Sequence, residues 1–89
     1  MNTKIYAIYD NKAEAFMEPY FATTPGLALR AFSVGANNKE TTIGKFPNDF
    51  VLYEIGQFND QTAELENYTE NKNLGIAIEY IESELRSVK

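Results

Sequence analysis

The chain has 89 residues, of which 44% are hydrophobic and 24% are charged, a composition typical of one soluble globular domain spanning residues 1–89. It contains no cysteine and no histidine, which excludes disulfides, thiolate chemistry and the commonest general base and metal ligand. The net charge is −5, and the acidic excess lies in residues 54–89, because the charges of residues 1–53 cancel. An acidic surface disfavours non-specific nucleic-acid binding, so a basic face would have to come from the first half.

The first predicted element is a strand over residues 4–10. Its two alternating sets of side chains are both apolar, and Tyr6 belongs to one set while Ile5 belongs to the other. A strand of this kind is usually covered on both faces. Turn residues follow at 11–12, and residues 13–20 can return as the second arm of a hairpin. Because Pro19 cannot donate to a strand ladder, that arm is an edge or ends there.

A helix is predicted over residues 23–37. Thr23 or Thr24 can cap its first turn, Pro25 suits the first helical position, and Asn37 is a plausible end.

The polar residues inside this helix form one narrow stripe, and the rest of its circumference is apolar: the stripe consists of Arg30, Ser33 and Asn37. A helix this apolar is covered on more than one side. We therefore expect the sheet on one flank and either another helix or a second subunit on the other, which makes a homodimer the expected assembly.

The second half begins with a weak helical turn at 38–46 and a turn at 46–50. The clearest strand of the chain follows at 50–58, with a weaker partner around 64–66 and an irregular polar segment at 68–72. A final helix capped by Asn73 is predicted from one apolar stripe: Leu74, Ala77, Ile78, Ile81, Leu85 and Val88. The expected fold is α+β, with a four-stranded, mainly antiparallel sheet in β-hairpin–helix–β-hairpin–helix order.

No catalytic constellation is evident, and the five glycines never form a phosphate-binding cluster. No acidic pair has the spacing of a metal site. We therefore expect no enzyme activity, no cofactor and no metal, although a deep pocket holding two carboxylates would revive a hydrolase. No apolar run approaches the ~20 residues that span a bilayer, and the N-terminus is not a signal peptide, so neither membrane insertion nor secretion is expected.

The twelve aromatic residues, six Tyr and six Phe, allow two interpretations. Tyrosines on predicted strands, Tyr6 and Tyr53 among them, could stack on bases near the cations of the first half: Lys12, Arg30, Lys39 and Lys45. Alternatively, the rings fill a small core and a dimer interface. Spacing alone favours this second interpretation.

Four segments occur in the order found in a known family: Ile5–Glu14, Gly26–Phe32, Phe46–Phe50 and Gly56–Asp60. They resemble the small nonstructural protein of gokushoviruses, single-stranded DNA phages of the Microviridae. The resemblance spans residues 4–66 and implies a DNA-binding protein of the bacterial host cytoplasm that favours single-stranded genome synthesis and packaging. The chain departs from the family at Ala63, where relatives often have Gly. The segment 74–89 has no counterpart.

Two hypotheses follow. In the first, the protein binds single-stranded DNA, with Lys12, Arg30, Lys39 and Lys45 contacting phosphates and Tyr6 and Tyr53 stacking on bases. In the second, it is an interaction module that binds a viral or host replication protein or a capsid protein without contacting DNA. A contiguous basic face would favour the first hypothesis. An uninterrupted acidic surface with a buried Arg30 salt bridge would favour the second.

Overall fold

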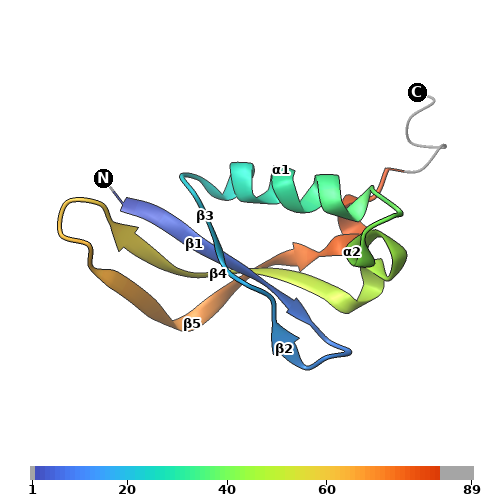
Figure 1. The fold of residues 1–89 in the computed structure, drawn as a ribbon, viewed down its shortest axis with the longest axis horizontal. Helices are drawn as coiled ribbons and strands as arrows, with labels where there is room; N and C mark the ends of the chain where they lie inside the picture. Colours follow the sequence, from blue (N-terminus) through green and yellow to red (C-terminus); the bar gives the residue numbers. More distant parts are fainter. Residues whose placement is uncertain (1, 83–89) are drawn as a thin grey trace.

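The computed structural model describes residues 2–82. Its elements follow one another as β1 (Asn2–Asp10), β2 (Ala15–Phe16), β3 (Tyr20–Ala22), α1 (Pro25–Ala36), α2 (Thr42–Lys45), the 3₁₀ helix η1 (Pro47–Asp49), β4 (Phe50–Asn59), β5 (Leu65–Ile76) and the 3₁₀ helix η2 (Ala77–Tyr80). The strands form one antiparallel sheet in the order β2-β1-β4-β5, and β3 also pairs with β1. Helix α1 covers one face of this sheet (Figure 1). The predicted α+β class is confirmed.

The central pair β1–β4 sorts alternate side chains onto two faces. Tyr6 pairs with Glu54 and Ile8 with Leu52 on the side that α1 covers, whereas Ala7 and Tyr53 pair on the other side. The pairing shifts between Ile5 and Tyr6, which leaves an extra residue in β4 and bends the strand.

Helix α1 begins and ends as its residue types predict. The Thr24 hydroxyl accepts a hydrogen bond from the Leu27 amide at 3.2 Å, Pro25 occupies the first turn, and Asn37 is the C-terminal cap. Its buried side packs on the sheet and on η2 to form the hydrophobic core: Tyr6, Ala28, Phe32, Ala36, Phe50, Leu52 and Ala77.

The end of the described chain differs from the prediction. Residues 68–72, expected to be irregular, lie within β5, and the helix expected from Asn73 is wrong over the described residues, because β5 continues to Ile76 and only a 3₁₀ turn follows. The remainder of that predicted helix, 83–89, lies outside the described residues. Backbone pairing with β4 over Asn73–Ile76 outweighs the local helical periodicity.

The chain beyond η2 is held by the helix cap. The Asn37 amide donates to the Tyr80 carbonyl at 2.9 Å, and its side-chain oxygen accepts a hydrogen bond from the Glu82 amide at 2.8 Å. Asn37, one member of the polar stripe of α1, therefore holds the chain after η2 in place.

Candidate nucleic-acid interface

One end of the molecule is built from the β1–β2 turn, the connection after α1, and α2 with η1. The Asp10 carboxylate accepts hydrogen bonds from the amides of Lys12 at 2.9 Å and Ala13 at 3.3 Å, which shapes the turn. The Asn11 amide donates to the Asp49 carbonyl at 2.8 Å and ties this turn to η1. Lys12 is thereby held beside the α2–η1 segment.

Two more lysines are brought to this end by a close packing contact. The Thr41 hydroxyl caps α2 by accepting from the Gly44 amide at 3.0 Å. A Cβ at Gly44 would lie 2.0 Å from the Asn38 carbonyl oxygen, so only glycine allows the connection after α1 to pack against α2 here. Lys39 follows Asn38 and Lys45 follows Gly44, so the two lysines flank this contact.

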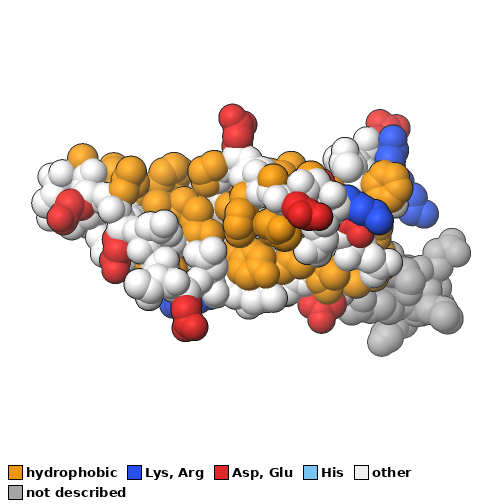
Figure 2. Space-filling model, turned by 90° about the horizontal axis from the view of Figure 1, so that it is seen from below, with side chains coloured by type: hydrophobic (Ala, Val, Ile, Leu, Met, Phe, Trp, Pro, Cys, Tyr) orange, Lys and Arg blue, Asp and Glu red, His pale blue; other side chains and the backbone are white. Residues whose placement is uncertain are grey.

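A cavity of about 350 Å³ opens at the same end. We call this region the basic end: it comprises Lys12 and Phe46, which line the cavity, and Lys39 and Lys45, which lie on the adjoining segments and do not line it. The cavity is lined by Asp10, Lys12, Thr42, Phe46, Asp49 and Phe50. Phe46 is 56% exposed and lines the same cavity as Lys12. Figure 2 shows basic side chains, in blue, at the end of the molecule where α2 lies. Because Asp10 and Asp49 border the same cavity, its lining carries both signs of charge.

The two predicted stacking residues are not part of the basic end. Tyr6 is fully buried between the sheet and α1, which corrects the prediction that it stacks on a base. The sequence could not show this, because both faces of the predicted strand are apolar. Tyr53 is half-buried on the face away from α1, where its ring lies 5.8 Å from that of Phe16. Phe46 was missed, although it directly follows Lys45.

Arg30 is not part of the basic end and does not line its cavity. It is exposed on the outward side of α1, between Leu27 and Val34, which are exposed as well. Within the part of the chain that the structure describes, Arg30 forms no salt bridge. Neither discriminating observation named above is therefore met in full, because the cations are divided between the basic end and the outer side of the helix.

The other two described lysines, Lys4 and Lys72, contact side chains of the same chain. The Lys4 Nζ donates to the Gln57 side-chain oxygen at 3.2 Å. The Lys72 Nζ lies 3.8 Å from a carboxylate oxygen of Glu54 and 5.2 Å from the centre of the Tyr68 ring.

Glu54 is the centre of a buried polar cluster on the side of the sheet that α1 covers. It is buried, and the Tyr68 hydroxyl donates a hydrogen bond to its carboxylate at 2.6 Å. Burial, followed by this hydrogen bond, raises the pKa of Tyr68 to about 12. Burial likewise raises the pKa of Tyr20, to about 12, and the Tyr20 hydroxyl donates to the Ala28 carbonyl of α1 at 2.9 Å. The Tyr68 hydrogen bond holds the Glu54 cluster together, and the Tyr20 hydrogen bond ties β3 to α1.

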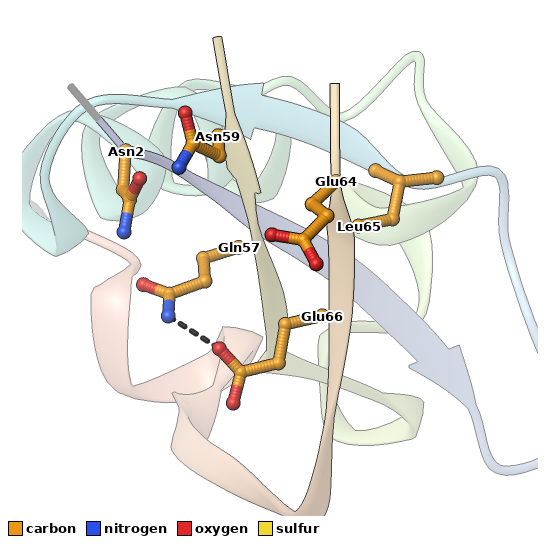
Figure 3. Close-up of a pocket in the computed structure, with 6 residues that line it drawn as sticks. All are labelled: Asn2, Gln57, Asn59, Glu64, Leu65 and Glu66. Carbon is orange, nitrogen blue, oxygen red and sulfur yellow. Dashed lines mark hydrogen bonds between the residues drawn. The ribbon is translucent and has the colours of Figure 1, made fainter. Parts of the chain in front are cut away.

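A second cavity, of about 320 Å³, lies at the opposite end, beside the β4–β5 hairpin (Figure 3). Apart from Leu65, its lining is polar or acidic: Asn2, Gln57, Asn59, Glu64 and Glu66. The Gln57 amide donates to the Glu66 carboxylate, as the dashed line in Figure 3 marks. Both glutamates are exposed, so the cavity gives neither carboxyl the dry surroundings that separate the pKa values of an acid–base pair. Two carboxylates also disfavour phosphate here.

Among residues 2–82, no three acidic side chains converge as possible metal ligands. No helix in the same range has the length and apolar character needed to cross a membrane.

The profile of a family described as Phage ORF5 protein matches residues 3–80. No curated protein and no solved structure gave a significant match.

Proposed function

The chain belongs to the Phage ORF5 protein family and is a phage protein, and we propose that it is a non-enzymatic, nonstructural protein that binds single-stranded DNA. It would act in the cytoplasm of the bacterial host and promote synthesis and packaging of the single-stranded genome. The observation that carries this proposal is the cavity shared by Lys12 and the exposed Phe46, with Lys39 and Lys45 on the two segments that pack together next to it.

Lysines and an exposed ring are the two components that single-stranded DNA needs. The ammonium groups attract phosphates and release counterions, and a ring stacks on an unpaired base whatever its identity. A duplex offers no unstacked base to Phe46. With a net charge of −5, the protein confines its attraction for DNA to this end. Three phosphate contacts correspond to a slope of log K against log salt of about −2.

The test is a titration of fluorescent single-stranded and duplex oligonucleotides by anisotropy at low and moderate salt. The single strand is expected to bind at about micromolar Kd and to weaken with salt. Lys12→Gln combined with Lys45→Gln should reduce the magnitude of the salt slope by about 1.4, and Phe46→Ala should weaken binding by about tenfold or more.

Arg30→Gln is the matched control, because it removes the same charge from the outer side of α1. It should leave the affinity close to that of the unmodified protein. Equal losses from Arg30→Gln and from the lysine variants would mean diffuse attraction without a site at the basic end. Absence of binding by the folded protein at low salt would reject DNA binding.

A second candidate function is binding of a replication or capsid protein without DNA contact. It is favoured by β5, an edge strand of the sheet whose residues 65–67 and 69–73 are exposed. Such an edge can pair with an extended segment of a partner. If the folded protein does not bind DNA, the next experiment is to look for a protein partner that binds this edge.

A further inference from the structure

The sheet has a second face, which we call the open face. It consists of the strand side chains that point away from α1, and its main members are Ile5, Phe16, Phe21, Tyr53, Phe58 and Leu65. Two ring contacts organise it, because Phe16 lies 5.8 Å from Tyr53 and Phe21 lies 6.0 Å from Phe58. Figure 2 shows a continuous hydrophobic band along this side of the molecule.

No element of the described chain forms a second layer over this face. Helix α1 covers the other face, and η2 and α2 pack against α1. Leu65 remains 69% exposed and Phe21 54% exposed. A sheet that is apolar on both faces normally has a layer on each side.

The central strands carry no charge on the open face. Their charged residues all lie on the side that α1 covers: Lys4, Asp10 and Glu54. Copies that each carry −5 repel one another wherever their acidic surfaces meet. Contact through the open face therefore brings no like charges of the central strands together. Because these strands have no charged side chain on this face, they also offer nothing there to attract a charged partner such as DNA.

The open face also has both projections and recesses. A groove of about 290 Å³ is lined mainly by the apolar residues Ile5, Pro19, Phe21, Ile55 and Leu65, and also by Gly56, Glu66 and Asn67. A two-fold dimer places the same surface opposite itself, so an exposed Leu65 or Phe21 of each copy can fill the groove of the other.

The dimensions of the face suit a small stable dimer. β1 has nine residues, about 30 Å at 3.4 Å per residue, and four strands at about 4.8 Å spacing are about 19 Å wide. This is on the order of 600 Å² per copy and 1,200 Å² for a pair, at the lower end of specific interfaces.

We propose that the open face is covered by a second copy of this chain, giving a face-to-face β-sandwich homodimer. The contact lies on the side of the molecule opposite α1, the helix whose apolar surface led us to expect a dimer from the sequence. It leaves the outer side of α1 exposed. The dimer does not depend on DNA binding.

The test is the mass of the protein in solution, measured by sedimentation velocity and by light scattering over a range of concentrations. The unmodified chain should be a dimer. Phe21→Glu and Leu65→Glu, tested separately, should raise the dimer Kd at least a hundredfold and yield folded monomers, as judged by circular dichroism. Val34→Glu, which places the same charge on the outer side of α1, should remain dimeric.

Because the chain has no cysteine, single labels provide a test that does not rely on disrupting the interface. Asn71→Cys places a nitroxide beside a groove of the open face, and Val34→Cys places one on α1. The pair of labels at 71 should be much closer together than the pair at 34. A monomer at every concentration, or a dimer lost only in Val34→Glu with labels closest at 34, would overturn the proposal.

Discussion

The two faces of the sheet are made from alternate residues of the same strands, yet their side chains have opposite surroundings. On the side that α1 covers, Phe32 and Leu52 are fully buried, and Glu54 is satisfied by Tyr68 and Lys72. On the open face, rings contact rings and no charged residue of the central strands is present. The comparison shows that helix α1 covers one face of the sheet, whereas no element of residues 2–82 covers the other, where we propose a second copy.

The largest expected difference separates two phenylalanines. Phe32→Ala should cost about 3–5 kcal/mol of unfolding free energy, because Phe32 is 2% exposed and the void cannot be filled. Phe16→Ala should cost about 1–2 kcal/mol in the monomer, because Phe16 is 46% exposed. Urea unfolding at protein concentrations below the dimer Kd measures the loss of unfolding free energy in each variant. Equal losses would place Phe16 in the core of the isolated chain and remove the distinction between the faces.

The elements that depend on local signals were predictable from the sequence. Thr24, Pro25 and Asn37 mark the ends of α1, and the β-branched and aromatic run 50–58 marks β4. The face that α1 covers was not predictable, since Ile5 and Tyr6 are both suited to burial. Tyr6 was therefore expected beside DNA, although it lies in the core.

The prediction of a final helix was wrong for a related reason. Leu74, Ala77, Ile78 and Ile81 have helical spacing, but a strand end followed by a 3₁₀ turn also carries Leu74 and Ala77 to the core. The polar segment 68–72 shows no alternation, and only its long-range pairing with β4 makes it a strand. At the candidate site, the convergence of Lys12 with α2 depends on the Asn11–Asp49 hydrogen bond, which no local pattern reveals.

A smaller effect tests the polar cluster of the covered face. Tyr68→Phe removes the hydroxyl that donates to the Glu54 carboxylate and should cost about 1.5–3 kcal/mol at neutral pH. Tyr6→Phe is the control, because the buried Tyr6 hydroxyl has no hydrogen-bond partner among the described residues, and its removal should leave stability unchanged or higher. Urea unfolding of both variants provides the comparison. A larger loss in Tyr6→Phe would contradict it.

Tyr68 of this cluster and Tyr20, which bonds to α1, predict a decline of stability in alkali. The pKa values of Tyr68 and Tyr20 are raised to about 12 in the folded protein, whereas an unfolded tyrosine loses its proton near pH 10. The unfolded chain therefore releases protons first. The stabilisation is complete below pH 10 and is lost as the pH rises toward 12. The decline should be shallower in Tyr68→Phe, as unfolding measured across this range would show.

The smallest expected effect is at the loop of the β4–β5 hairpin, which belongs to neither face of the sheet. Ala63 has a φ of +65°, in the left-handed region that glycine occupies without strain, and its amide donates to the Asn59 carbonyl at 2.7 Å. Ala63→Gly should relieve about 1 kcal/mol of backbone strain. Because glycine has greater freedom in the unfolded chain, part of this gain is offset, and the variant should be about 0.5 kcal/mol more stable. Thermal unfolding should show a slightly raised Tm with an unchanged dimer Kd. A lowered Tm would mean that the loop relaxes in solution, and a changed dimer Kd would mean that the hairpin takes part in the contact between copies.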